Sequence, residues 1–194
     1  MAEKYVDIDT LKYLLYDIHN LEELLVRDRF QDHDKESLDM FIDSVKEFAD
    51  RELFPYVKEM DENPAYHKDG KVFVHDQVKT MMYKGGEMGL ISAPFNYEDG
   101  GMQIPFLSHT AATYILDAAN NHLPGYAGLT QGAAELIIHF ANKELNQTYV
   151  PNMLSGQWGG TMCLTEPQAG SSLSDIVTKA TPTQDGYYKL TGQK

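Results

Sequence analysis

The chain has 194 residues, of which 42% are hydrophobic and 23% are charged, so it is long and apolar enough to bury a sizeable core and is not a disordered or collagen-like chain. Its 29 acidic and 16 basic residues give a formal charge of −13, which disfavours nucleic-acid binding because neutralising phosphates requires a basic face. The single cysteine, Cys163, excludes a disulfide framework and zinc sites that use two or four cysteines.

The first residues show no basic segment followed by an apolar run, and no apolar stretch reaches about 18 residues. We therefore expect neither a signal peptide nor a membrane span, and the cytoplasm is the expected compartment. The negative charge is concentrated in residues 1–64, which hold 18 acidic and 8 basic residues. An acidic amphipathic face is usually the solvated side of a helix.

Helical periodicity marks the first part of the chain. Apolar residues recur at helical spacing between Leu11 and Ile18, where Asp9 or Thr10 suits the N-cap. A stronger apolar stripe extends from Leu38 to Leu53, and we expect Ser37 to cap its helix and Pro55 to stop it.

The middle of the chain alternates between loops and helices. Residues 61–73 have the composition of a loop, and a short helix from about residue 76 to 83 is expected to break at Gly85, Gly86 and Gly89. After an irregular connection over residues 90–101, three further helices are predicted, at about 105–118, 126–140 and 143–154.

After Gly159 and Gly160 the pattern changes to that of β-structure. A short strand is predicted over residues 161–164. Residues 177–181 and 187–191 are rich in β-formers and flank Asp185-Gly186, which is a strong hairpin signal. The chain thus reads as a helical domain followed by the first strands of an unfinished β-domain, since an isolated hairpin is marginal in water.

The segment Met162 to Ser172 has the residues of a binding site. Pro167 fixes one φ angle and Gly170 permits the opposite sign, so consecutive backbone N–H groups can face one anion. Thr165 and Ser171 add hydroxyl donors. Such a loop suits a nucleotide cofactor, although an ordinary polar turn has the same composition.

The run Leu-Thr-Glu-Pro-x-Ala-Gly-Ser at residues 164–171, with Leu-Thr-Gly-Gln-Lys at 190–194, resembles the acyl-CoA dehydrogenase family of flavoproteins. Residues 89–101 and 149–156 match family segments in the same order. The resemblance implies a mainly α fold with a helical N-terminal domain at residues 37–157. Residues 158–194 would then begin an incomplete antiparallel β-barrel domain, and residues 1–36 resemble the N-terminal helical extension of longer bacterial members.

The resemblance also implies a cofactor, FAD. The residues that match its binding segment are Met162, Cys163, Leu164, Thr165, Gly170 and Ser171. Ser171 would also lie near the thioester substrate. Met162 stands where many members have an aromatic residue and Ser172 where many have aspartate. The family's acyl pocket would fall at the helix start Ala127 to Gly132.

The implied reaction oxidises acyl-CoA to trans-2-enoyl-CoA and passes electrons to an electron-transferring flavoprotein, commonly in a homo-oligomer. The catalytic base is expected beyond Lys194, so no residue here is assigned to it, and we expect the chain alone to bind FAD poorly and to be inactive. Glu135 and His139 have the spacing of a helix-surface pair, so no metal site is predicted. The alternatives are an acyl-CoA oxidase or a DNA-alkylation-response relative of this fold, and a non-catalytic helical interaction module with the acidic face 1–64 as its contact surface.

Overall fold

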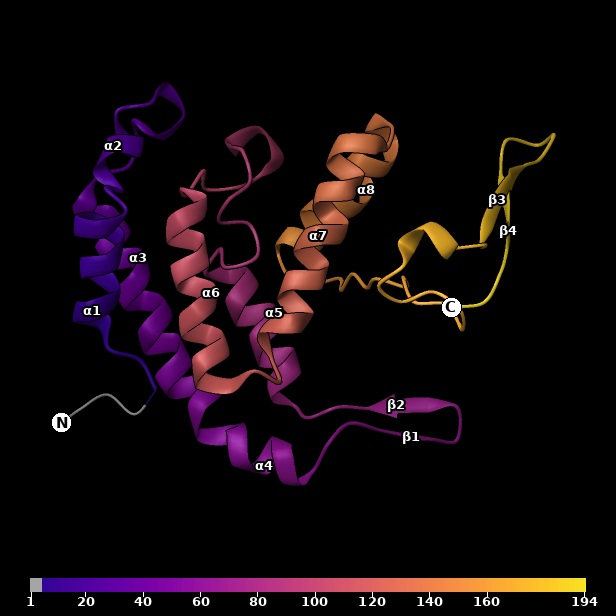
Figure 1. Cartoon of the computed structure of the whole chain (residues 1–194), viewed down its shortest axis with the longest axis horizontal. Helices are drawn as coiled ribbons and strands as arrows, with labels where there is room; N and C mark the ends of the chain where they lie inside the picture. The colour runs from indigo at the N-terminus through magenta and orange to yellow at the C-terminus, as the bar shows by residue number, and fades with distance from the viewer. Residues whose placement is uncertain (1–4) are drawn as a thin grey trace. The chain divides into compact units, whose positions relative to one another are not determined.

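The computed structural model describes residues 5–194, which fall into two compact units. The first ends at Gly160 and the second comprises Thr161–Lys194. Figure 1 shows that the first is built almost entirely of helices. The expected mainly α fold with a few antiparallel strands is confirmed.

The helices of the first unit follow one another through short connections. They are α1 (Ile8–Tyr13), α2 (Glu22–Leu25), α3 (Lys35–Phe48), α4 (Val57–Glu62), α5 (Gln77–Glu87), α6 (Phe106–Asn120), α7 (Pro124–Phe140) and α8 (Lys143–Leu154). Turns of π-helix extend α1 to Ile18 and α3 to Leu53. The last three helices match the predicted ranges to within two residues.

The core of this unit forms where α3 packs against α6 and α6 lies beside α7. The apolar stripe of α3 is buried from Leu38 to Phe48, and Leu53 in the following π turn is also fully buried. Ile115 is its fully buried counterpart on α6. Burying one such side chain stabilises a protein by about 1.5–3 kcal/mol, so these helices are held together mainly by apolar contact.

The N-caps of the first two predicted helices differ from expectation. Helix α1 is capped by Asp7, whose carboxylate accepts a hydrogen bond from the backbone N–H of Thr10 at 3.1 Å. Helix α3 is capped by Asp34, and Ser37 lies inside the helix, where its hydroxyl accepts from the N–H of Asp34. Each predicted cap was placed about three residues too late because an oxygen-bearing side chain in the first turn also suits a capping box.

Helix α5 continues through Gly85 and Gly86, so the predicted break there is wrong. A Cβ at Gly86 would overlap the backbone carbonyl of Ser155, at the end of α8. The glycine therefore permits close packing of two chain segments instead of ending the helix. The chain leaves α5 at Gly89, whose φ of +76° is in the left-handed region that favours glycine.

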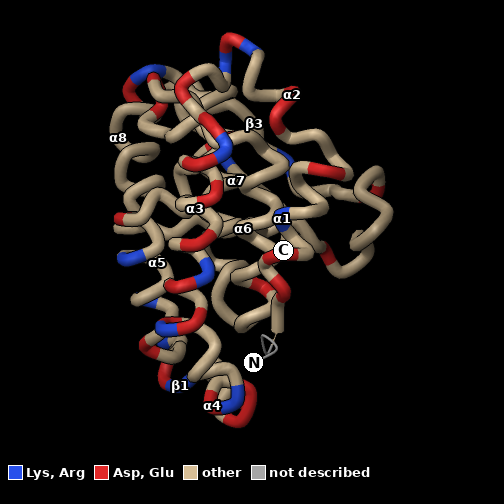
Figure 2. Tube along the Cα trace, turned by 90° about the vertical axis from the view of Figure 1, so that its left-hand side faces the viewer, with Lys and Arg blue, Asp and Glu red and all other residues tan. Residues whose placement is uncertain are grey.

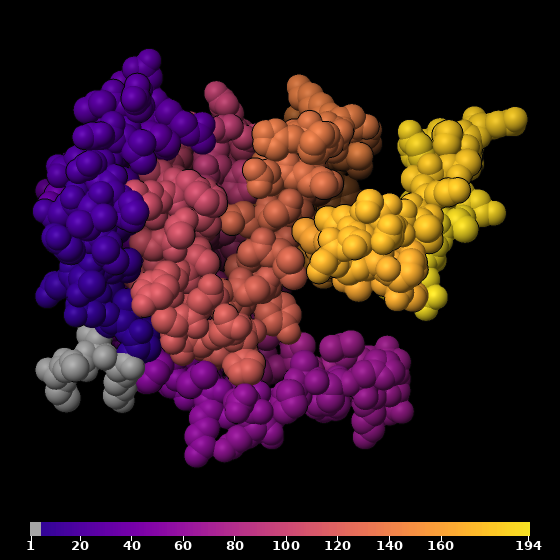
Figure 3. All heavy atoms as spheres, in the orientation of Figure 1, coloured from indigo at the N-terminus to yellow at the C-terminus, as the bar shows by residue number. Residues whose placement is uncertain are grey.

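A β-hairpin occupies part of the predicted loop 61–73. Strand β1 (Tyr66–Lys68) pairs with β2 (Lys71–Phe73), and positive φ angles at Asp69 and Gly70 form the turn. The rings of Tyr66 and Phe73 stack across the pair with centroids 5.0 Å apart. Figure 3 shows the hairpin extending away from the helices, and its side chains are exposed.

The second unit contains one hairpin, of β3 (Lys179–Pro182) and β4 (Tyr188–Thr191), around Asp185-Gly186 as predicted. The predicted strand over residues 161–164 is absent. That segment has no ladder partner among residues 5–194, so its β-forming side chains alone do not make it a strand.

Acidic residues recur along α3 and its neighbours, as the red segments of Figure 2 show. The exposed carboxylates Asp43 and Asp50 are paired with Lys12 and Lys46. No helix in the described part of the chain is long and apolar enough to cross a membrane.

Candidate functional site

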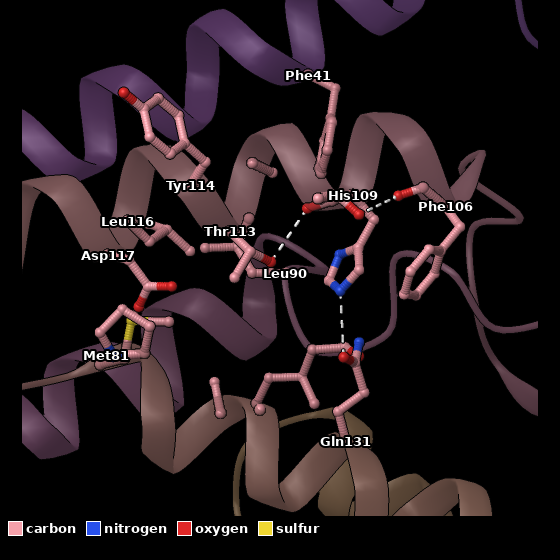
Figure 4. A pocket seen from close by; sticks show the side chains of 16 residues that line it. Phe41, Met81, Leu90, Phe106, His109, Thr113, Tyr114, Leu116, Asp117 and Gln131 are labelled. Atoms are coloured by element: carbon pink, nitrogen blue, oxygen red, sulfur yellow. Dashed lines mark hydrogen bonds between the residues drawn. The ribbon is translucent and has the colours of Figure 1, made fainter. Parts of the chain in front are cut away.

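A cavity of about 530 Å³ opens in the helical unit, between α6 and α7. Helix α5, the connection at Leu90-Ile91 and Phe41 of α3 complete its wall (Figure 4). Most of the lining is apolar. Ala127 and Gly128 of α7 have little or no side chain and leave the space open, and both belong to the helix start Ala127 to Gly132 singled out in the sequence. The cavity is therefore suited to an apolar chain.

A polar pair stands inside this apolar wall. His109 of α6 and Gln131 of α7 are hydrogen-bonded, with 3.1 Å between Nε2 and Oε1 (Figure 4). The amide nitrogen of Gln131 donates to the carbonyl of Ile91 at 2.9 Å, which turns its oxygen toward the imidazole. The Nε2 atom of His109 must then carry the hydrogen, and Nδ1 is left as an acceptor.

Burial favours the uncharged form of this histidine. Burial lowers the pKa of His109 more than the hydrogen bond that its ring donates to Gln131 raises it, so the ring is neutral near pH 7. Asp117, two turns further along α6, also lines the cavity, and burial raises the pKa of its carboxyl. Its carboxylate accepts a long hydrogen bond of 3.4 Å from Asn121.

Sequence reasoning missed this polar stripe. His109, Thr113 and Asp117 follow one another at intervals of four residues along a helix whose other faces are largely apolar. Residues four apart lie on the same helix face. Polar residues at this spacing in an otherwise apolar helix were the available signal.

The cofactor-binding residues expected from the sequence lie in the second unit. The residues expected to bind FAD are all exposed: Met162, Cys163, Leu164, Thr165, Gly170 and Ser171. Residues 166–169 form a tight turn, in which Glu166 and Ala169 exchange two backbone hydrogen bonds. The backbone N–H groups of residues 162–165 donate no hydrogen bond within the described chain, so they remain available to a ligand.

Glu166 holds this segment in place, a role that sequence reasoning did not assign. Glu166 is only 4% exposed, whereas the other residues of this unit are exposed apart from Ala169 and two half-buried positions. The carboxylate accepts from the backbone N–H groups of Val177 at 2.9 Å and Thr178 at 3.1 Å. Lys194 forms an ion pair with it at 2.9 Å and also donates to the carbonyl of Leu164.

These contacts stabilise the ionised form of Glu166. The backbone N–H groups of Val177 and Thr178 and the Lys194 ammonium keep the pKa of Glu166 far below the ordinary value of 4.5. The buried carboxylate thereby fixes the start of β3 and Lys194 against the tight turn. The Thr-Glu-Pro run thus has a structural member, Glu166, between exposed residues that are free to contact a ligand.

The donor set of residues 162–171 fits a flavin nucleotide in kind. Exposed backbone N–H groups suit ring carbonyl oxygens, and the hydroxyls of Thr165 and Ser171 suit ring or phosphate oxygens. No side chain fills the space around Gly170, where an added Cβ would meet nothing within 4 Å. The exposed segment therefore offers room and donors together.

Comparison with known proteins points to one family. Residues 35–157 match the family model described as acyl-CoA dehydrogenase, N-terminal domain. A butyryl-CoA dehydrogenase from Syntrophomonas wolfei is 30% identical over 189 residues, which are 95% of this chain and 31% of that protein. The chain thus spans less than a third of the length of this curated relative.

Solved structures share the fold. An acyl-CoA dehydrogenase from Bacillus anthracis, complexed with FAD, superimposes with a TM-score of 0.67 at 24% identity, over 84% of this chain and 27% of that one. A structure reported for the electron transferring flavoprotein of Acidaminococcus fermentans superimposes with a TM-score of 0.63 at 29% identity, over 82% of this chain and 39% of that one.

Proposed function

This chain belongs to the acyl-CoA dehydrogenase family, and we propose that it supplies the helical N-terminal domain and the first flavin-binding segment of an enzyme that oxidises acyl-CoA to trans-2-enoyl-CoA. The proposed division is a helical extension at residues 1–36, the helical domain at 37–157 and the start of the middle β-domain at 158–194. The observation that carries the proposal is the apolar cavity between α6 and α7, within the part of the chain that the family model matches.

In this proposal the cavity binds the acyl chain. Its walls from Phe41, Met81 and Leu116 exclude water, and the small residues of α7 determine how much of the chain fits. The buried apolar surface of the substrate contributes affinity of about 25 cal/mol per Å² before the costs of association. Oxidation itself requires a base that we do not assign to any described residue.

We propose that residues 162–171 hold FAD, which accepts a hydride from the substrate when it is bound. The backbone N–H groups of residues 164 and 165 and the Thr165 hydroxyl would donate to the pyrimidine edge of the ring. Donors fixed at that edge stabilise negative charge there and so favour the reduced state. Ser171 would donate to the pyrophosphate and lie near the thioester. The FAD-bound Bacillus anthracis neighbour supports this part of the proposal.

An electron-transferring flavoprotein is the proposed acceptor, supported by the Acidaminococcus fermentans neighbour. We also propose a homo-oligomer in the cytoplasm. Oxygen uptake during turnover would point to an acyl-CoA oxidase instead.

The proposal is tested with the whole protein that carries this chain, loaded with FAD. Anaerobic addition of acyl-CoA should bleach the visible flavin absorbance and yield enoyl-CoA. A protein that binds FAD but stays unbleached by acyl-CoA of every chain length would disprove the proposed activity.

Chain-length preference tests the role of the cavity. An added Cβ at Gly128 meets nothing within 4 Å and Gly128 lines the cavity, so Gly128→Leu should fill the space without a backbone clash. We expect kcat/KM for the longest accepted acyl-CoA to fall about tenfold or more relative to the shortest. The matched control is Gly132→Leu, one turn along α7, where a Cβ is equally unhindered but the residue does not line the cavity. Equal effects of the two substitutions would show that the acyl chain lies elsewhere.

A further inference from the structure

The polar atoms of the cavity define what a chain bound in it must offer. The Thr113 hydroxyl donates to the carbonyl of His109 at 3.1 Å, so its hydrogen is already used and a lone pair remains. The Nε2 hydrogen of His109 is used by Gln131, and no described residue donates to Nδ1. Of the hydroxyl and imidazole groups in the lining, those of Thr110 and Tyr114 belong to exposed residues. The half-buried part of the wall therefore presents two hydrogen-bond acceptors, His109 Nδ1 and Thr113 Oγ, one helical turn apart on α6.

The cavity is unsuited to an anionic end. None of the described residues that line it is a lysine or an arginine, whereas Asp117 contributes a carboxyl group. A carboxylate placed there would meet acceptors and a second acid without a compensating cation.

A cationic end is also disfavoured, although Asp117 is present. The lining is mainly apolar, and an ammonium loses its hydration shell on entering such a wall. Burial raises the pKa of the Asp117 carboxyl, which shows that this wall disfavours charge. A neutral donor satisfies His109 and Thr113 without either cost.

Resting on the proposed function, we infer that the preferred substrate is a hydroxyacyl thioester, with the hydroxyl on the chain beyond the reacting carbons and donating to His109 Nδ1 or Thr113 Oγ. Gln131 acts as a positioning residue, because its bonds to Ile91 and His109 keep Nδ1 free of hydrogen. The uncharged hydroxyl leaves the rest of the chain in apolar contact with the wall.

The test uses the FAD-loaded whole protein and short acyl-CoA thioesters that end in a hydroxyl, with methyl-ended thioesters of the same length as isosteres. At the chain length that the protein accepts best, we expect kcat/KM to be about tenfold higher for the hydroxyl-ended thioester than for the methyl-ended one. This ratio corresponds to the free energy of one neutral hydrogen bond. Thioesters ending in a carboxylate or an ammonium should be poorer than both. The same order should appear in the Kd values for the chemically reduced protein, which binds these thioesters without oxidising them.

His109→Phe removes the acceptor and keeps a flat ring, and Thr113→Val removes the hydroxyl and keeps the shape. In each variant the ratio between hydroxyl and methyl substrates should fall toward one. His139→Phe is the matched control, since His139 is exposed on α7 and does not line the cavity, and it should leave the ratio unchanged.

Two outcomes would overturn the inference while leaving the proposed function intact. One is oxidation of methyl-ended and hydroxyl-ended thioesters with equal kcat/KM and equal Kd. The other is a hydroxyl preference that survives both His109→Phe and Thr113→Val. Failure of every thioester to bleach the flavin would instead overturn the proposed function, and the inference with it.

Discussion

The two units of this protein are stabilised by different kinds of interaction. The helical unit buries a continuous set of apolar side chains. Three of them, Ile42, Leu53 and Ile115, have no exposed surface at all. The unit 161–194 buries only Glu166 and Ala169, and its hairpin strands are exposed along their whole length. The segment with the strongest family motif is thus held by a charged hydrogen-bond network and not by a core.

This difference has a consequence for mutations. In an apolar core the cost of a substitution depends on the volume removed and on how far neighbours can relax. In a network centred on one carboxylate, a single change of charge removes several hydrogen bonds at once. The two units should therefore respond to different substitutions and to different conditions.

The largest expected effect is in the core of the helical unit. Ile115→Ala should lower the free energy of unfolding by about 2–5 kcal/mol, because it leaves a cavity where α6 meets the other helices. Thermal and denaturant unfolding followed by circular dichroism measure it. Leu136→Ala is the control, since Leu136 is 62% exposed and should cost less than about 0.5 kcal/mol. Equal losses from the two would show that the core assignment is wrong.

A smaller effect is expected where α5 meets the end of α8. Gly86→Ala places a Cβ against the carbonyl of Ser155 and should destabilise the helical unit by about 1–3 kcal/mol. Gly132→Ala adds the same methyl group to α7, where nothing lies within 4 Å. It should be neutral or stabilise by up to about 1 kcal/mol, since alanine is the better helix former. Denaturant midpoints of both variants provide the comparison, and destabilisation by Gly132→Ala alone would contradict it.

The smallest expected effect on global unfolding comes from Glu166→Gln, which should act on the second unit only. The amide loses the charge and one of the two acceptor oxygens, so hydrogen-exchange protection at Val177 and Thr178 should fall about tenfold. The melting temperature of the helical unit should not change. Asp175→Asn, an exposed acid in the same unit, is the control. A large drop in helical stability would refute the separation of the two networks.

Acid should reproduce this local effect in the unmodified protein. The pKa of Glu166 is lower in the folded state than its ordinary value of 4.5, so the carboxylate contributes stability above that pH. The contribution is lost progressively as the pH falls below about 4.5 toward the folded-state pKa. Protection factors at Val177 and Thr178, corrected for intrinsic exchange, should follow this loss. Constant protection down to strongly acid pH in the unmodified protein would contradict it.

Much of the architecture was predictable because local chemistry agreed with the final fold. Apolar spacing located α3, α6, α7 and α8, and the Asp185-Gly186 signal located the β3–β4 hairpin. The equivalent signal at Asp69-Gly70 marks the β1–β2 hairpin. The composition of residues 61–73 nevertheless predicts a loop there. The strands there are only three residues long, and lysines interrupt their pattern.

The sequence by itself determined the helical class, the family resemblance and the hydroxyl donors Thr165 and Ser171. Spacing, turn chemistry and a local motif can each be read along one segment. Tertiary structure alone decided that Gly86 packs against Ser155 and that Glu166 receives Val177, Thr178 and Lys194. It also brought His109 to Gln131, 22 residues away, in a cavity between two helices. These three results depend on contacts between segments distant in the chain, and a pattern along one segment carries no information about the partner it will meet.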